Sequence, residues 1–194
     1  MKNTSLILMI AFSYTSFAQT STLGNQTWMT ENLDVVTFRN GDSIPEAKTD
    51  KEWQLANEQG KPAWCYYLNK KSNGKKFGKI YNGYAISDSR KLAPVGFHIP
   101  TVSEWSILLK VADSNFNFNS KKILNKLNFN LKLGGYRFDG GSFNDIKTSC
   151  FWWSSTEYFQ TKNAYVFFIE KNSDEVVTEL HGYDWGFYVR CISD

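Results

Sequence analysis

Two short runs of aromatic and branched apolar residues, each containing a cysteine, most constrain the fold of this chain. One extends from Trp64 to Tyr67 and the other from Gly186 to Ser193, and they contain Cys65 and Cys191. Short runs of this composition are typical of buried β-strands. We therefore expect two buried strands, one in the first half of the chain and one at its end.

The cysteines allow one disulfide. Three cysteines in an exported chain leave one thiol over once a pair has formed. We predict a bond between Cys65 and Cys191, whose strand-like runs can lie side by side, and we take Cys150 as the odd thiol. Three buried thiols are the alternative that the sequence leaves open, because spacing alone does not determine a pairing.

Two helix starts can be located from capping residues. The segments 49–52 and 101–104 both contain Thr-x-x-Glu. In this capping box the hydroxyl and the carboxylate satisfy backbone N–H groups at the first turn of a helix. We therefore predict short helices beginning near Asp50 and Val102.

The second half of the chain has mainly the pattern of strands, separated by turn residues. Two early helices followed by such a series of short antiparallel strands predict an α+β fold. We expect a polar loop at 70–79 and a weak helix at 121–126. The expected strands are 28–33, 35–38, 78–86, 131–138, 151–154, 164–169, 176–180 and 186–192.

Residues 1–18 have the pattern of a signal peptide. Lys2 is followed by the apolar run 6–12 and by the small-x-small site Ser16-Phe17-Ala18. The apolar run is shorter than the roughly 20 residues that span a bilayer. We therefore predict export and a mature chain, 19–194, that forms one domain, has no membrane-spanning segment and is secreted, periplasmic or at the cell surface.

The distribution of charge and the small number of histidines argue against several classes of function. The formal charge of +3 includes Lys2, and the other lysines are scattered, so we expect no nucleic-acid partner. His98 and His181 are the only histidines, and no zinc-ligand spacing is present. We therefore predict no catalytic residues, no metal and no cofactor, and a structural role for His98.

The aromatic side chains are the better candidates for ligand binding. Neighbouring strand residues point to opposite faces, so we expect one of Trp152 and Trp153 in the core and the other at the surface. Tyr158, Tyr183 and Asp184 lie in or beside loops near them. Aromatic rings beside polar groups suit glycan or protein ligands, although plain packing is the alternative for each ring.

Six blocks of the chain occur in an order that is typical of one known family, and they are 24–33, 62–67, 92–105, 134–137, 152–156 and 186–191. Together they resemble the Fibrobacter succinogenes major paralogous domain. The resemblance covers the chain from about Thr22 onward and implies a C-type-lectin-like fold, with paired N- and C-terminal strands and two short helices flanking antiparallel sheets with long irregular loops. Two departures are Gly83, where the family usually has Trp, and a short, lysine-rich segment 114–130.

Together these features predict an exported, non-catalytic module that binds a glycan or a protein at the cell surface. Two alternatives remain. One is an oxidase-like enzyme related to formylglycine-generating enzymes, which the resemblance allows and which needs a close pair of reactive cysteines. The other is a structural component of the envelope.

Overall fold

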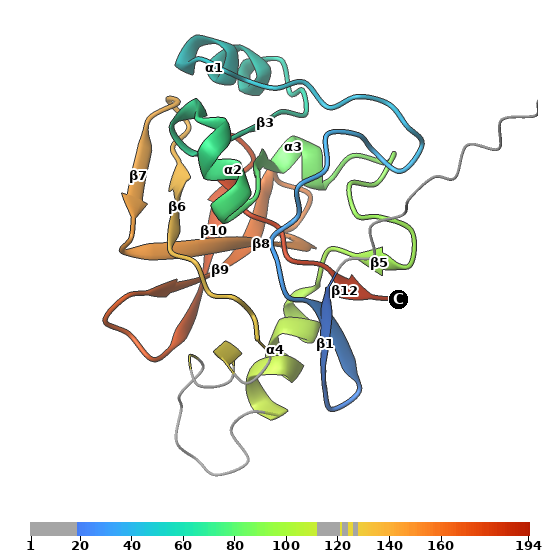
Figure 1. The fold of residues 1–194 in the computed structure, drawn as a ribbon. Coiled ribbons are helices and arrows are strands. Elements are labelled where there is room, and N and C mark those ends of the chain that lie inside the picture. The colour runs from blue at the N-terminus through green and yellow to red at the C-terminus, as the bar shows by residue number, and fades with distance from the viewer. Residues whose placement is uncertain (1–18, 112–120, 122–123, 126–127) are drawn as a thin grey trace, which may run out of the picture.

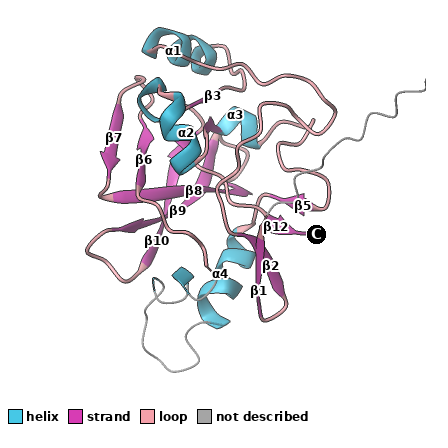
Figure 2. Ribbon diagram, in the orientation of Figure 1, coloured by secondary structure: helices cyan, strands magenta, loops and turns pink. Residues whose placement is uncertain are grey.

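The computed structural model describes residues 19–111, 121, 124–125 and 128–194. The predicted signal peptide, 1–18, and most of the segment 114–130 lie outside the described residues. Of the weak helix expected at 121–126, residues 121, 124 and 125 are described, and they are helical. The described part has a mixed α+β architecture in which two sheets are accompanied by short helices (Figure 2). None of its helices is long and apolar enough to cross a bilayer.

The smaller sheet joins the two ends of the domain. Its strand order is β1-β2-β12-β5, and Ile192 in β12 lies opposite Trp28 in β2 and His98 in β5. The N- and C-terminal strands therefore pair, as the family resemblance implies. The bounds are β1 (Thr20–Leu23), β2 (Gln26–Met29), β5 (Phe97–His98) and β12 (Ile192–Ser193).

The larger sheet has the order β10-β9-β8-β6-β11-β4-β3, with β7 beside β6. Its pairs are antiparallel except for β6 and β8, which run parallel. The strands β8 and β9 form a long hairpin whose residues alternate between two largely buried faces. The bounds are β3 (Trp64–Cys65), β4 (Ile80–Asn82), β6 (Gly134–Arg137), β7 (Phe143–Ile146), β8 (Ser149–Glu157), β9 (Asn163–Glu170), β10 (Val176–Gly182) and β11 (Gly186–Phe187).

Both predicted capping boxes are confirmed. Helix α1 (Asp50–Glu58) begins after Thr49, whose Oγ1 accepts a hydrogen bond from the Glu52 backbone N–H at 3.1 Å. Helix α4 (Val102–Val111) begins after Thr101 with the same pairing to Glu104. The two helices lie at opposite ends of the molecule, α1 at the top of Figure 1 and α4 at the bottom beside the β1–β2 hairpin.

The helical content between these two helices exceeds the prediction. Helix α2 (Lys71–Phe77), preceded by a 3₁₀ turn at Tyr67–Asn69, occupies most of the expected loop. Helix α3 (Gly83–Ile86) interrupts the expected strand 78–86, because the Asn82 side chain accepts from the Ala85 N–H and so caps a helical turn.

Several strand boundaries also differ from the prediction. The expected strand 35–38 is reduced to one bridge between Thr37 and Ser43, and β7 has no counterpart among the expected strands. The run 186–192 is divided between β11 and β12, which belong to different sheets. The connecting residues 188–191 are buried and carry the chain from one sheet to the other.

Candidate functional site

The two tryptophans predicted to flank the ligand surface are both buried. Trp152 and Trp153 are each 0% exposed and belong to different hydrophobic clusters. Their indole N–H groups donate to Asn32 Oδ1 at 3.0 Å and to the Tyr81 carbonyl at 2.8 Å. They do point to opposite faces of β8, but the expectation of one outward-facing ring is wrong because both faces of this strand are covered.

Of the other predicted ligand residues, only Tyr158 is exposed. Tyr183 is buried, and its hydroxyl donates to Glu157 Oε1 at 2.6 Å. Asp184 is half-buried, and its backbone carbonyl accepts from the side chains of Trp53 and Asn57. Tyr158 lies at the β8–β9 turn, where its ring packs edge-on against a second exposed ring, Phe159. The structure therefore does not bring the five predicted residues together as one surface.

Tyr183 also explains why glycine stands at position 83. A Cβ on Gly83 would lie 2.5 Å from the Tyr183 Cα and 2.4 Å from its ring. A larger side chain therefore does not fit there without moving β10 or the turn after it.

The predicted Cys65–Cys191 disulfide is not formed. Cys65, Cys150 and Cys191 are all free and buried, and burial raises the pKa of their thiols to about 11, 12 and 12. Cys65 lies in the larger sheet, whereas Cys191 precedes β12 of the smaller sheet, and the two belong to different hydrophobic clusters. The alternative of three buried thiols is the one observed.

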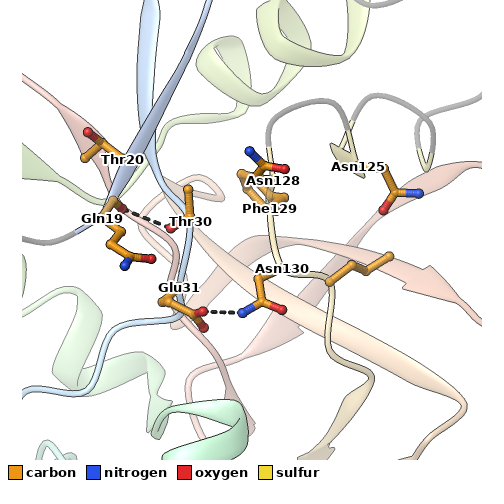
Figure 3. A pocket seen from close by; sticks show the side chains of 9 residues that line it. Gln19, Thr20, Thr30, Glu31, Asn125, Asn128, Phe129 and Asn130 are labelled. Atoms are coloured by element: carbon orange, nitrogen blue, oxygen red, sulfur yellow. Dashed lines mark hydrogen bonds between the residues drawn. The ribbon is translucent and has the colours of Figure 1, made fainter.

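A polar pocket of about 740 Å³ is the strongest candidate for a binding site (Figure 3). One wall comes from the beginning of β1 and the residues after β2, and the other comes from Asn125 and residues 128–131. The lining residues are Gln19, Thr20, Thr30, Glu31, Asn125, Asn128, Phe129, Asn130 and Leu131.

Hydrogen bonds fix the first wall and tie it to the second. Thr30 donates from its backbone N–H and its hydroxyl to the Gln19 carbonyl, at 2.8 and 3.2 Å. The Glu31 carboxylate accepts from the Asn130 amide, and from Lys132 Nζ at 3.1 Å. Glu31 therefore joins two chain segments about 100 residues apart and remains 49% exposed at its side chain.

The second wall is shaped by local backbone geometry. Asn128 and Asn130 have φ angles of 49° and 40°, in the left-handed region that asparagine tolerates better than most residues. Between them Phe129 turns inward, is 1% exposed and packs against Trp28, Trp105 and Trp152. This alternation leaves the two amides at the surface of the pocket and anchors the wall on the core.

The donor set favours a ligand rich in hydroxyl groups. Side-chain amides offer both donors and acceptors, and the Glu31 carboxylate offers acceptors only. Glu31 is the one charged residue in the described lining, and Lys132 partly compensates its charge. Phe129, the aromatic residue of the lining, is buried, so recognition there depends on hydrogen bonds rather than on ring stacking.

Comparison with known proteins places the chain in a family. The model of the Fibrobacter succinogenes major domain matches residues 22–120, just over half of the chain. The chain belongs to this family. No curated protein and no solved structure matches the chain. In this Fibrobacter succinogenes major domain, the pocket wall at Thr30 and Glu31 lies inside the matched range, and the wall formed by Asn125 and residues 128–131 lies beyond it.

Sequence reasoning did not identify the residues of this pocket. Glu31 lies in the block 24–33, but no motif marks Gln19, Glu31 or Asn130 as ligand residues, and only the pairing of β1 with β2 and the anchoring of Phe129 bring them together. The asparagines of 114–130 are a signal that could have pointed toward this region, where we noted only the lysines.

His98 is held between two carboxylates, as expected for a structural histidine. Its Nε2 lies 2.7 Å from Glu104 Oε1, and its Nδ1 lies 2.8 Å from Asp194 Oδ1. Partial burial acts to lower the pKa of His98, but these hydrogen bonds outweigh it, and the pKa is raised above its ordinary value. Within the described residues, no group of three or more His, Cys, Asp and Glu side chains is placed to hold a metal.

We expect the hydrogen bonds of His98 to Glu104 and Asp194 to stabilise the fold mainly at acidic pH. Because the folded-state pKa of His98 is raised, its stabilisation is present below the unfolded pKa of about 6.5 and is lost as the pH rises through the folded value. The loss of stability caused by His98→Gln should therefore be larger near about pH 5.5 than near about pH 8.5. Urea unfolding at the two pH values measures it.

His181→Gln is the matched control. Burial lowers the pKa of His181 despite a hydrogen bond to Glu179, so protonation favours the unfolded state. The pH trend of this variant should have the opposite sign. Equal losses of stability for His98→Gln at both pH values would show that the charge of His98 does not stabilise the fold.

Proposed function

We propose that this chain is an exported, non-catalytic binding module whose ligand is a neutral glycan bound in the polar pocket. The observation that carries the proposal is the pocket itself, a hollow of about 740 Å³ lined by four side-chain amides, two hydroxyls and one carboxylate. Binding sites for small ligands are concave and use a few polar groups to fix orientation. Amides suit the neighbouring hydroxyls of a sugar ring, which are donors and acceptors in turn.

The proposal also includes a C-type-lectin-like fold and export of the mature chain. The pairing of the terminal strands β2 and β12, with helices beside the sheets, supports this fold. The signal-peptide pattern of residues 1–18 supports export and a secreted, periplasmic or cell-surface location for the mature chain, 19–194.

The oxidase-like alternative receives less support. Such an enzyme needs a reactive pair of thiolates, and reactive cysteines are partly exposed with lowered pKa values. Here burial raises the pKa of all three thiols. Rapid labelling of two thiols in the native protein at neutral pH would favour the enzyme. A structural envelope component would instead show stable self-association without affinity for glycans.

The direct test is binding of mature protein to an array of bacterial and plant polysaccharides, with and without EDTA. For a glycan that binds, Glu31→Gln should weaken binding by about tenfold or more, because it removes charge-assisted hydrogen bonds worth about 1.5–3 kcal/mol. Glu175→Gln, at an exposed turn, makes the same chemical change elsewhere and should bind normally.

Three outcomes decide the proposal. Saturable binding that Glu31→Gln weakens would establish the pocket as a glycan site, and loss in EDTA would add a bound cation to it. Binding that Glu31→Gln leaves unchanged would move the site elsewhere. The absence of any glycan binding would favour a protein partner or an envelope role.

A further inference from the structure

The strand β10 forms an open edge of the larger sheet. It stands at one end of the strand order, and within the described residues it pairs only with β9. Residues 177–180 are all exposed, and Val177 and Leu180 are each 42% exposed. Proteins protect edge strands from pairing with other chains by means of lysine, proline or a bulge. The run Val176–Gly182 has no lysine and no proline, pairs with β9 without a bulge, and contains one carboxylate, that of Glu179.

The ladder between β9 and β10 shows which backbone groups face outward. The Tyr183 N–H donates to the Lys162 carbonyl at 2.9 Å, and bonded pairs alternate with non-bonded pairs along an antiparallel ladder. The odd-numbered residues of β10 therefore bond to β9. The Gly182 carbonyl, which accepts from the Trp185 N–H at 3.2 Å instead of from β9, has the orientation that this alternation requires. The residues whose N–H and C=O groups point to the open side are thus Thr178, Leu180 and Gly182.

These outward groups have few partners in the single chain. Among the described residues, no backbone hydrogen bond reaches Thr178 or Leu180 from the open side. The edge can therefore accept a further strand without losing a bond that it already makes. An extended segment that adds to such an edge gains a series of main-chain hydrogen bonds.

The sequence of the edge is complementary to itself in one antiparallel register. Outward-facing residues must lie opposite outward-facing residues, so the two-fold axis between two copies falls at a residue of the strand. An axis at Glu179 would place two carboxylates opposite each other, which is destabilising, and an axis at Thr178 would place Glu179 opposite the apolar Val177. An axis at Leu180 places Leu180 opposite Leu180 and Glu179 opposite His181. These last two side chains already form a hydrogen bond of 3.2 Å within one chain, between His181 Nε2 and Glu179 Oε2.

We propose that β10 pairs antiparallel with β10 of a second copy of this chain, with the two-fold axis at Leu180. In this dimer the Leu180 N–H of each copy donates to the Leu180 carbonyl of the other, and Thr178 lies opposite Gly182 on both sides of the axis. The two Leu180 side chains, exposed in the single chain, contact each other across the axis. The larger sheets of the two copies then form one continuous sheet.

This interface is independent of the glycan proposal, because none of its residues lines the polar pocket. Self-association alone also does not identify an envelope component, which would in addition lack affinity for glycans. The dimer is therefore tested without any ligand.

Sedimentation velocity of the mature chain should show a dimer whose fraction increases between about 10 µM and about 1 mM. We expect weak association, because one short pair of strands forms a small interface. Amide hydrogen exchange, followed by NMR at both concentrations, identifies the interface. The amides of Thr178 and Leu180 should exchange about threefold or more slowly at the higher concentration, whereas those of α1 should not change.

Leu180→Lys is the decisive variant, because it places two ammonium groups opposite each other in the dimer and replaces a side chain that is exposed in the single chain. The dissociation constant of the dimer should increase about tenfold or more. Leu55→Lys, the same change at a residue of α1 that is 49% exposed, is the matched control and should dimerise as the wild type does. Circular dichroism shows that both variants are folded.

Three results would each overturn the proposal. One is a wild-type chain that stays monomeric at about 1 mM. The second is a dimer that Leu180→Lys leaves unchanged, and the third is a dimer in which exchange at Thr178 and Leu180 does not become slower.

Discussion

Replacing Trp152 by alanine should lower the free energy of unfolding by about 3–5 kcal/mol, the usual cost of removing a large buried aromatic side chain. Trp152 is fully buried, and its ring centroid lies 5.8 Å from that of Trp105 and 5.9 Å from that of Phe129. The variant also removes the indole donor to Asn32, an acceptor that Arg190 shares. Urea denaturation of the mature chain measures the change.

Phe159→Ala is the matched control for this prediction. Phe159 is 80% exposed at the β8–β9 turn, so its loss should change the stability by less than about 0.5 kcal/mol. A Trp152→Ala protein of normal stability that had lost glycan binding would contradict the structural role. That result would instead support Trp152 as a ligand residue, one of the two tryptophans that the sequence offered as candidates.

Replacing Arg190 by methionine should cost about 2 kcal/mol or more, because it deprives the buried carbonyls of Met29 and Phe129 of their guanidinium donor, at about 1–3 kcal/mol each. Asn32 Oδ1 keeps its second donor, the Trp152 indole. The guanidinium donates to Asn32 Oδ1 at 3.1 and 2.8 Å and to the carbonyls of Met29 and Phe129 at 3.3 and 2.8 Å. Burial lowers the pKa of Arg190 to about 10, which leaves the group charged at neutral pH. Chemical denaturation of this variant beside the wild type provides the measurement.

Two further variants serve as controls for this prediction. Arg190→Lys should recover only part of the loss, since one ammonium cannot reproduce the planar fork that serves three acceptors. Arg90→Met removes an arginine whose side chain is 35% exposed and paired with Asp88 and Asp42, and it should cost less than about 1 kcal/mol. Near wild-type stability of Arg190→Met would show that the carbonyls of Met29 and Phe129 find water or other donors.

Arg190 also connects the core to the polar pocket. It donates to the carbonyl of Phe129, the residue between the two pocket asparagines, and its guanidinium carbon Cζ lies over the Phe129 ring, 4.3 Å from the ring centroid. The wall at 128–130 therefore depends on a residue near the C-terminus. The proposed glycan binding should therefore be weaker in Arg190→Met than in the wild type, even under conditions where the variant remains folded.

The sequence by itself determined the features that depend on near neighbours or on a composition maintained over a run of residues. The starts of α1 and α4 were predicted because a capping box involves residues only three positions apart. The strands β8, β9 and β10 were located because aromatic and β-branched residues fill them. The resemblance to the Fibrobacter succinogenes major domain was also visible in the sequence, because it depends on the order of blocks along the chain.

Only the tertiary structure decided which surfaces are covered and which distant segments meet. Alternation along β8 places Trp152 and Trp153 on opposite faces, but it does not say that apolar clusters cover both faces. The separation of Cys65 from Cys191 likewise follows from two sheets, and the sequence shows only two similar strands. The polar pocket forms where Glu31 meets Asn130, about 100 residues further along the chain. Contacts of this range depend on the packing of the whole domain, which leaves no local signal in the sequence.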